Sequence, residues 1–467
     1  MKNQQTPGID EVFERALATI RTRVVPSAPT PGDGVAIAYS GGLDSSALLH
    51  LAHRHAQKNG TRLFAFHVHH GLSVDADAWL QHCASECARL DITFAAQRVQ
   101  LAGAGTSGIE AAARSSRYAA LGAMCRDHRV PLLLTAHHQD DQAETVLLQL
   151  LRGSGVAGLS GMDTANCAPD LLGDSVLVMA RPLLSLSREQ LAGFVAREAI
   201  THVDDASNLD TRYARNALRH EVMPALSTFF PGFQHRLART AGHAQSAQRL
   251  LIELATQDLA LCAAGEALDI SCLRALSADR ADNLLRYWFG SRGVRMPSTS
   301  WLHEMRTQLF EAKPDAQLCV THADCHIRRH RDQVFITPHR VEFDPDELPV
   351  ISFHWRGEAR LDFPDLNGAL LFEDAEQGVA ASWLSEQALA ISLRSGGERL
   401  KPAPNRSTRA LKYHYQAGNV PAWERERLPV VRVGKKLLFA AGVGMDCHHF
   451  STADEPRIAL RWVFTTD

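Results

Sequence analysis

The residues best suited to chemistry first appear in a glycine- and serine-rich segment, Ser40-Gly41-Gly42-Leu43-Asp44-Ser45-Ser46. This segment lies between the apolar run 35–39 and a helical pattern over 45–57. Glycines let backbone N–H groups approach a phosphate closely, serine hydroxyls add donors, and a helix N-terminus supplies partial positive charge. We therefore predict a nucleotide-phosphate site formed by Ser40, Gly41, Gly42, Leu43, Asp44 and Ser45.

Asp44 distinguishes this segment from a lysine-containing phosphate loop, because no GK[ST] sequence is present in it. A carboxylate beside a polyphosphate is repelled unless a cation lies between them, so Asp44 is a candidate Mg²⁺ ligand. The alternative is a structural role at a helix N-terminus, where Asp and Ser are favoured. The complete strand–loop–helix context favours phosphate binding.

A second group of polar residues, Thr135-Ala-His137-His138-Gln-Asp140-Asp141-Gln-Ala-Glu144, follows the apolar run 130–135. His137 precedes a predicted helix and is placed to contact an α-phosphate or to transfer a proton. Asp141 is the second candidate Mg²⁺ ligand, and Glu144, three residues further on, shares its helix face. The alternative is that these acidic residues only complement the dipole of the helix. The position of the group after a strand of the same sheet favours a role in the active site.

The order of predicted elements supports an α/β fold for the first half of the chain. Strand-like runs at 35–39, 63–68, 92–99 and 130–135 alternate with helical patterns at 45–57, 75–90, 108–128 and 140–151. Such alternation predicts a parallel sheet covered on both faces, with ligands at the carboxyl ends of its strands. We predict three domains: a catalytic domain at 1–225, a mainly helical domain at 226–385 and a small α+β domain at 386–467.

Bulk composition restricts the class of protein. The net charge of -3 implies no partner by itself, and 45% hydrophobic residues is ordinary globular composition. No CxxC motif accompanies the nine cysteines, which we predict to be unpaired thiols in a reducing cytosol. The N-terminal residues lack a signal-peptide core, and no run is long enough to span a membrane. We expect a soluble cytoplasmic protein, and no protein partner is implied.

The segment SGGLDSS resembles the pyrophosphatase loop of the PP-loop ATP-pyrophosphatase superfamily, whose N-terminal fold is adenine-nucleotide-α-hydrolase-like. Four further segments resemble the tRNA(Ile)-lysidine synthase family: His67-Val-His-His-Gly-Leu72, Glu110-Ala-Ala-Ala-Arg114-Ser-Ser-Arg117-Tyr118, the run 135–155, and Asp204–Arg219. The similarity is dense over 35–225 and returns at 392–446. Ser73 departs from the arginine that is usual in the family, which puts one phosphate or RNA contact in doubt, and Ala206 departs from its proline.

This resemblance implies an ATP- and Mg²⁺-dependent ligase. ATP would adenylate the 2-carbonyl oxygen of the wobble cytidine in a tRNA(Ile) with a CAU anticodon, and free L-lysine would then displace AMP to give lysidine. Asp44, His137, Asp141 and Arg114 are the expected catalytic residues, with Arg114 holding nucleotide or phosphate charge. Either Glu110 or Glu144 would bind the lysine ammonium group or take its proton.

Basic residues predict where RNA binds. Residues 394–436 contain eleven lysine and arginine residues against three acidic ones, interleaved with aromatic residues. We predict tRNA contacts at Arg399, Lys401, Lys412 and Arg425. A second basic group is Arg212, Arg215, Arg219, Arg236 and Arg239, and we predict that some of these, Arg212, Arg215 and Arg219 among them, contact tRNA phosphates. The alternative for the 394–436 segment is a solvated basic face.

Two other functions compete with this prediction. One is another PP-loop enzyme that modifies tRNA or amidates a substrate, although the absence of CxxC disfavours a cytidine-thiolating type. The other is a non-catalytic protein that binds tRNA or senses a nucleotide. Such a protein would tolerate loss of Asp44, His137 and Asp141, whereas all three are present.

Overall fold

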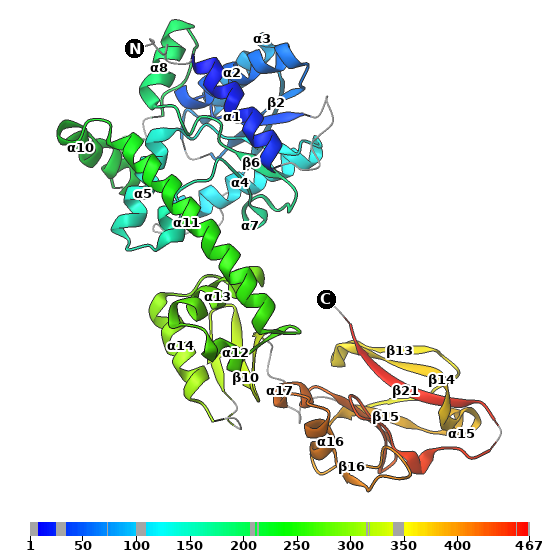
Figure 1. Cartoon of the computed structure of the whole chain (residues 1–467). Helices are drawn as coiled ribbons and strands as arrows, with labels where there is room; N and C mark the ends of the chain where they lie inside the picture. Colours follow the sequence, from blue (N-terminus) through cyan, green and yellow to red (C-terminus); the bar gives the residue numbers. More distant parts are fainter. Residues whose placement is uncertain are drawn as a thin grey trace. The chain divides into compact units, whose positions relative to one another are not determined.

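Figure 1 shows the computed structural model of the chain. It describes residues 8–24, 34–71, 73–99, 109–205, 211–212, 214–313, 316, 318–339, 350–453 and 455–465, without the side chains of 23–24 and 109–111. Two compact units divide the chain, Met1–Ile252 and Glu253–Asp467, and each is described by itself.

The first unit is built on a six-stranded sheet with the order β3-β2-β1-β4-β6-β5. The strands are β1 (Val35–Ala38), β2 (Leu63–His69), β3 (Thr93–Arg98), β4 (Leu132–Leu134), β5 (Ala165–Cys167) and β6 (Val178–Ala180). All neighbouring pairs are parallel except β5 and β6, which are antiparallel. The predicted parallel sheet is confirmed.

The strand order reverses between β1 and β4. The chain runs outward from β1 through β2 to β3, and then returns past β1 to form β4 on its other side. In open α/β sheets, ligands bind outside the carboxyl ends of the strands at such a reversal. Ser40 follows β1 and Thr135 follows β4, so both predicted polar groups lie at this point.

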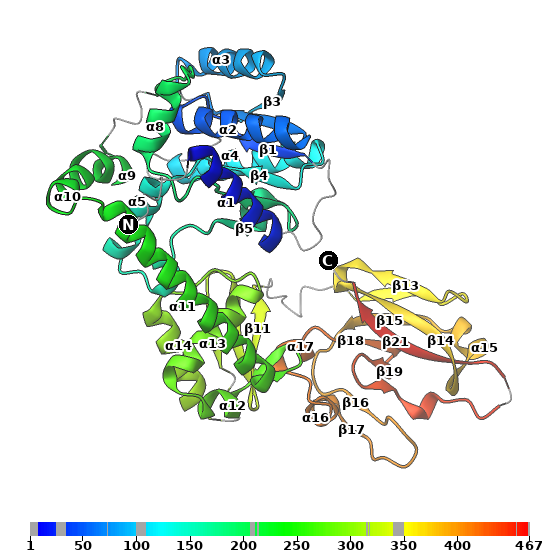
Figure 2. The same cartoon turned by 45° about the horizontal axis from the view of Figure 1, so that its top comes forward.

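Helices cover both faces of the sheet, as Figure 2 shows. The helices of this part of the chain are α1 (Ile9–Val24), α2 (Leu43–Asn59), α3 (Ala76–Arg89), α4 (Ile109–Asp127), α5 (Gln139–Leu151), α6 (Val156–Leu159), α7 (Pro169–Leu172) and α8 (Arg188–Arg197). Alternate residues of β1 enter different cores: Val35 and Ile37 pack with α1, α2, α3 and α8, whereas Ala36 packs with α4 and α7. This alternation follows from the two-residue period of a strand.

The first unit ends in a set of helices beside α5. They are α9 (Ala214–Ala217), the π-helix η2 (Leu218–Val222), α10 (Met223–Phe229) and the start of α11 (Phe233–Cys262). A small core joins them to α5 through Ala143, Leu218, Met223 and Phe233, all of them buried. The carboxylates on the first turns of α5 are therefore held in one packed body with these helices.

The second unit contains two hydrophobic cores. One packs α12 (Ile270–Ala275), α13 (Ala278–Ser291) and α14 (Thr299–Glu311) on a sheet of β7 (Ala263–Ala264), β8 (Ala267–Asp269), β9 (Cys319–Thr321), β10 (Cys325–His330) and β11 (Gln333–Pro338). The other holds residues from Trp355 to Leu460. The mainly helical middle region and the small α+β C-terminal region are confirmed as fold classes.

The core that contains Trp355 and Leu460 is built from strands and short helices. The strands are β12 (Ile351–Phe353), β13 (Arg360–Phe363), β14 (Gly368–Ala380), β15 (Leu389–Leu393), β16 (Arg399–Leu400), β17 (Arg409–Ala410), β18 (Pro429–Val433), β19 (Lys436–Ala440), β20 (Gly444–Met445) and β21 (Arg457–Phe464). The helices are η3 (Pro364–Leu366), α15 (Ala381–Glu386), α16 (Leu411–Ala417), α17 (Ala422–Arg425) and η4 (Cys447–His449). The boundaries at 225 and 385 stay predictions.

One prediction about the cysteines is wrong. Cys262 and Cys272 form a disulfide, although all nine cysteines are predicted from the sequence to be unpaired. The physical reason is a tight hairpin of β7 and β8, which returns the chain from the end of α11 to the start of α12 and brings the two Cα atoms to 5.3 Å. Among the helices described, none has the length and apolar character needed to cross a bilayer.

Candidate active site

The loop after β1 needs glycine at position 41. Gly41 has a φ of +86°, and a Cβ atom there would lie 2.9 Å from the sulfur of Cys83 and 3.2 Å from Val203. The Gly41 carbonyl accepts a hydrogen bond from the Val203 backbone N–H at 2.9 Å. Gly42 is the N-cap of α2 and supplies no side-chain cap. No side chain of the N-cap residue therefore covers the first N–H groups of α2, which leaves them available to bind an anion.

Serine hydroxyls stiffen this turn from within. The Ser45 hydroxyl donates to the Gly42 carbonyl at 3.0 Å, and its oxygen lies 3.0 Å from the Ser40 hydroxyl. The Ser46 hydroxyl, fully buried, donates to the Gly41 carbonyl at 3.2 Å. Ser40 is exposed at the mouth of the loop. Ser40 is therefore the hydroxyl best placed to meet a ligand, while Ser45 and Ser46 hold the backbone.

Asp44 carries a carboxylate oxygen with unmet bonding capacity. Its Oδ1 is buried and has no hydrogen-bond partner among the described residues. Its Oδ2 lies 3.6 Å from His138 Nε2. A buried carboxylate oxygen without a partner is costly, and a bound cation would remove that cost. This observation fits the prediction of Asp44 as a Mg²⁺ ligand.

Asp141 is more fully engaged than Asp44. Its Oδ2 accepts a hydrogen bond from the His138 backbone N–H at 3.0 Å, and its own N–H donates to His138 Nδ1, so the two residues form a capping box. Burial would raise the pKa of Asp141, but His138, His137 and Arg215 outweigh burial and lower it. In the part of the chain described, no group of three or more His, Cys, Asp or Glu residues could hold a metal alone.

The two adjacent histidines have opposite electrostatics. Burial would lower the pKa of His138, but the hydrogen bond to Asp44 and the charges of Asp141, Asp44 and Asp140 raise it. Burial lowers the pKa of His137, and the charges of Arg181, Arg215 and Arg114 act in the same direction, although Asp141 opposes them. His137 is consequently neutral at ordinary pH, with Nδ1 2.9 Å from the Thr135 hydroxyl. His138 is the more readily charged of the pair.

Glu144 is held by two arginines from a segment about seventy residues later. Arg219 donates to both of its oxygens, at 2.6 and 2.9 Å, and Arg215 donates to Oε2 at 2.8 Å. The same two guanidinium groups reach Asp141 Oδ1 at 3.0 and 3.3 Å. The Glu144 side chain is 1% exposed, compared with 26% for Arg219 and 32% for Arg215. Arg215 and Arg219, predicted to contact tRNA, thus lie on the site carboxylates.

The other predicted residues are less closely gathered. Arg114 is exposed on α4, with its guanidinium 5.0 Å from the ring centroid of Tyr118. The side chain of Glu110 lies outside the described residues. Arg212 is exposed near the start of α9. The charge of Arg114 still acts on the pKa of His137, so this arginine belongs to the same electrostatic environment.

Two residues of the site were not predicted from the sequence. His138 contacts both aspartates, and the His-His pair is the only local signal that pointed to it. Arg181 follows β6, is 7% exposed, and donates to the Asp163 carbonyl and to Asn166 at 2.8 Å. Nothing in the local sequence marks Arg181, because its importance depends on the position of β6 beside β4.

The predicted tRNA contacts of the second unit differ in their exposure. Arg399 and Lys412 are exposed, and Lys401 is half-buried. Arg425 donates to the Val420 carbonyl at 2.7 Å, and burial, together with the charges of Arg394 and Arg331, lowers its pKa. The geometry makes Arg399 and Lys412 more accessible to a phosphate than Arg425.

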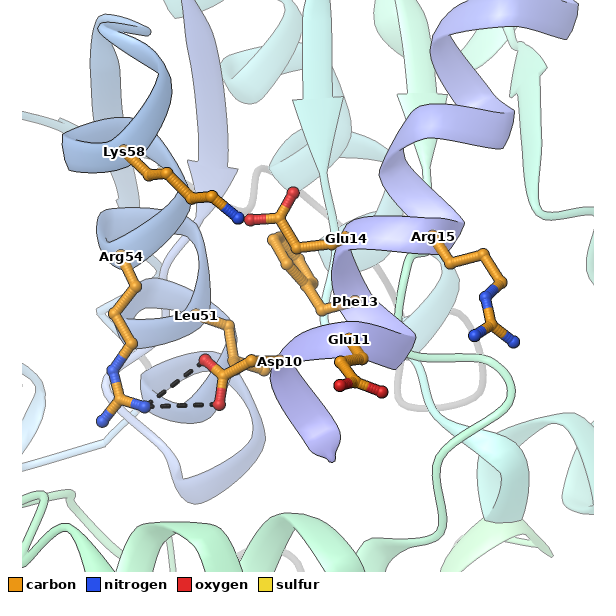
Figure 3. Close-up of a pocket in the computed structure, with 8 residues that line it drawn as sticks. All are labelled: Asp10, Glu11, Phe13, Glu14, Arg15, Leu51, Arg54 and Lys58. Atoms are coloured by element: carbon orange, nitrogen blue, oxygen red, sulfur yellow. Dashed lines mark hydrogen bonds and ion pairs between the residues drawn. The ribbon is translucent and has the colours of Figure 1, made fainter. Parts of the chain in front are cut away.

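The molecule also has a hollow away from these residues. Figure 3 shows it between α1 and α2, lined by Asp10, Glu11, Phe13, Glu14, Arg15, Leu51, Arg54 and Lys58. Arg54 points across it and forms ion pairs with Asp10 and with Glu198. None of the predicted site residues lines this hollow. The loop after β1, not the hollow, holds the arrangement suited to chemistry.

Comparison with known proteins agrees with this geometry. The family model described as PP-loop domain matches residues 11–226, that of the TilS substrate binding domain matches 268–335, and that of the TilS substrate C-terminal domain matches 389–462. The tRNA(Ile)-lysidine synthase of Burkholderia pseudomallei (strain K96243) is 42% identical over 452 residues, which cover 90% of this chain and 91% of that protein. The tRNA(Ile)-lysidine synthase of Ralstonia nicotianae (strain ATCC BAA-1114 / GMI1000) is 41% identical over 446 residues, covering 94% of each. With this identity over nearly its whole length, the chain belongs to the tRNA(Ile)-lysidine synthase family.

Proposed function

We propose that this chain ligates free L-lysine to the wobble cytidine of a tRNA(Ile) with a CAU anticodon, at the expense of ATP. The cytidine O2 attacks the α-phosphorus of ATP, and pyrophosphate leaves with the bonding electron pair. The ε-amine of lysine then attacks C2, loses a proton and expels AMP. The observation that carries the proposal is the Asp44 oxygen that has no partner among the described residues, beside the Gly41 turn at the carboxyl ends of β1 and β4.

The loop after β1 would hold the phosphates of ATP. Backbone N–H groups at the start of α2 and the exposed Ser40 hydroxyl supply donors, and Gly41 allows the close approach. Asp44 and Asp141 would hold Mg²⁺, which supplies compensation for the phosphate charge when bound. Because the two carboxylates share His138, this histidine would position Asp44 and Asp141 relative to each other.

His137 and Arg114 would act on the reacting phosphate. A neutral His137 can donate or accept a hydrogen bond there, but it brings no positive charge. Arg114 carries that charge on an exposed side chain. His137, after the end of β4, would therefore supply a neutral hydrogen-bonding group, and Arg114, on α4, would supply the positive charge.

Glu144 would receive the lysine ammonium group in place of one of its present partners, Arg215 or Arg219. In the described arrangement both Glu144 oxygens accept hydrogen bonds from arginine, so a lysine ammonium group must compete with a guanidinium. That competition suits a second substrate, because the buried carboxylate stays neutralised until lysine arrives. Glu110 is the other candidate for this role. Replacing the carboxylate that binds lysine with an amide should raise the KM for lysine and leave pyrophosphate release intact.

Labelled lysine incorporation tests the proposed function directly. The full chain is incubated with ATP, Mg²⁺, labelled lysine and a transcript of tRNA(Ile) with a CAU anticodon, and the label in the RNA is counted. We expect ATP-dependent incorporation that vanishes with a UAU anticodon. Pyrophosphate release without incorporation would mean a different substrate. Silence in both measurements would favour the alternative of a protein that binds tRNA or a nucleotide without catalysis.

A further inference from the structure

The corner between α10 and α11 exposes two aromatic rings that the fold does not use. Phe229, the last residue of α10, is 77% exposed, and Phe230, its C-cap, is 59% exposed. Phe233, three residues later, is 5% exposed and packs with Leu218 and Met223. Single exposed apolar residues are common, but two adjacent exposed rings form an unusual surface on a folded unit.

The corner is rigid, so both rings are presented in a defined place. The Phe230 N–H donates to the Leu226 carbonyl at 2.8 Å, and the Phe233 N–H donates to the Phe230 carbonyl at 3.0 Å. Pro231 and Gly232, the latter with a φ of +72°, make the turn between the two helices. The Arg236 guanidinium donates to the Pro231 carbonyl at 2.6 Å. A pre-formed aromatic surface loses little entropy when a ligand stacks on it.

The charge around this corner suits a polyanion. Residues 222–252 contain no Asp or Glu. Exposed polar and basic side chains recur along one face of α11, at Arg236, Arg239, His243, Ser246 and Arg249. Spacings of three and four residues place them on one stripe about 20 Å long. Aromatic rings beside a basic stripe are the combination that binds unpaired nucleic acid, with bases on the rings and phosphates on the cations.

The corner is tied to the candidate active site through one core. Phe233, Met223 and Leu218 pack against Ala143 of α5, whose first turn carries Asp141 and next turn Glu144. Ten residues of continuous helical chain separate Arg219, which contacts Glu144, from Phe229, so the distance along the helices is about 15 Å. That length corresponds to roughly four stacked nucleotides. Figures 1 and 2 both show α10 projecting from the body of the first unit.

We propose that Phe229 and Phe230 form a stacking platform for unpaired bases of the tRNA anticodon loop that flank the modified cytidine, with the α11 stripe contacting the adjoining phosphates. The two rings are positioning residues, because they bind bases that flank the cytidine and do not touch the reacting atoms. This inference rests on the proposed function and names further residues of its RNA site. Stacking requires an aromatic face, which a leucine of similar apolar character does not provide.

Binding of a CAU-anticodon stem-loop RNA to the full chain tests the platform by fluorescence anisotropy at fixed salt. We expect the double variant Phe229→Leu, Phe230→Leu to raise the Kd about tenfold or more, while Phe229→Tyr, Phe230→Tyr stays within about twofold. An RNA with abasic sites beside the wobble position should bind wild type and the leucine variant alike. Phe464→Leu, the same change at another exposed phenylalanine, is the matched control for the single variant Phe229→Leu, which should itself weaken binding.

Three outcomes would overturn the platform. Leucine variants that bind the stem-loop as wild type does would remove the rings from RNA binding. Equal weakening by leucine and tyrosine would make the contact one of shape instead of stacking. Loss of self-association in sedimentation, with unchanged RNA affinity, would make the corner a subunit interface. Failure of the proposed function is separate, because it would appear as no lysine incorporation by the wild-type protein.

Discussion

Asp44 and Asp141 lie on the first turns of α2 and α5, yet their carboxylates meet different surroundings. Asp141 accepts from the His138 N–H on one oxygen and from two guanidinium groups on the other. Asp44 has only a long contact with His138, and its second oxygen has no partner in the described part of the chain. Asp44 is thus the more open of the two to a cation, and Asp141 the more constrained.

The first prediction concerns the Asp44 carboxylate. Replacing it with an amide in Asp44→Asn keeps the shape but removes the charge that would hold Mg²⁺. We expect tRNA-dependent pyrophosphate release to fall at least about 100-fold, because metal compensation of phosphate charge contributes several kcal/mol. The Tm measured at alkaline pH, where His138 carries no charge for Asp44 to stabilise, should not fall, since Oδ1 has no partner among the described residues. Asp75→Asn, at the exposed N-cap of α3, is the matched control, and undiminished turnover in Asp44→Asn would remove this residue from the mechanism.

The second prediction concerns pH and stability, measured by denaturant unfolding in metal-free buffer. The pKa of His138 is raised in the fold, so its stabilisation is present below pH ~6.5 and is lost as the pH rises through the folded pKa. The pKa of His137 is lowered, so it costs stability as the pH falls below ~6.5.

The two histidines should therefore give pH profiles of opposite sign. The stability difference between wild type and His138→Gln should shrink above pH ~6.5, whereas that between wild type and His137→Gln should shrink below it. Parallel profiles for the two variants would contradict the assigned surroundings.

At the scale of elements, strong local patterns were sufficient for most of the first unit. The predicted runs 35–39, 63–68 and 92–99 became β1, β2 and β3 with ends shifted by one residue or so. The strand β6 was missed, although β4, predicted from the run 130–135, is equally short and equally buried; apolar runs of this length have no period, so periodicity cannot identify them. The π-helix η2 was missed because nothing in Leu218–Val222 distinguishes five-residue from four-residue hydrogen bonding.

Prediction of the site from sequence had a similar limit. Asp44 and Asp141 could be paired in advance because each follows a strand of one parallel sheet, whose carboxyl ends share an edge. The contacts of Arg215 and Arg219 with Glu144 could not, because they join segments separated by a long stretch of chain and follow from the packing of η2 against α5. A basic run predicted to contact RNA can thus also contact a buried carboxylate.

The third prediction concerns the disulfide of Cys262 and Cys272, which links the end of α11 to α12. Closing a loop of ten residues restricts the unfolded chain and stabilises by about 2–3 kcal/mol. Dithiothreitol should therefore lower the Tm of the oxidised protein by roughly 5–10 °C. Cys272→Ala should abolish this response, and Cys319→Ala, at an exposed free thiol, should retain it. A Tm insensitive to reduction in wild type would show that the disulfide contributes no stability.

At the scale of the whole molecule, the two units differ in what they offer to a substrate. The first unit holds the strand reversal, the Gly41 turn and the carboxylates, which are the parts suited to ATP chemistry. The second unit contains the basic segment 394–436, whose apolar residues pack in the core that extends from Trp355 to Leu460. The part of the RNA affinity that the second unit contributes should therefore respond to different substitutions from those that change reactivity, and the two can be measured separately.

The fourth prediction applies this separation to tRNA binding. Each phosphate contact that is lost reduces the slope of log K against log salt by about 0.7–0.9. The triple variant Arg399→Gln, Lys401→Gln, Lys412→Gln should reduce the slope by about 2–3 and weaken tRNA binding, while ATP binding stays unchanged. Arg425 is left out of this set because its Nε already donates to the Val420 carbonyl, so its removal would also disturb α17.

The control for that experiment is a triple variant with the same change in net charge, Arg15→Gln, Lys58→Gln, Arg356→Gln, at exposed positions outside both basic groups. If phosphates contact the named residues, the control keeps the wild-type salt slope, because distant charges are screened beyond a Debye length of about 10 Å. An equal loss of slope in both triple variants would mean that net charge alone drives association. In that case the basic segment 394–436 would be a solvated face, and tRNA affinity would have to come from the first unit.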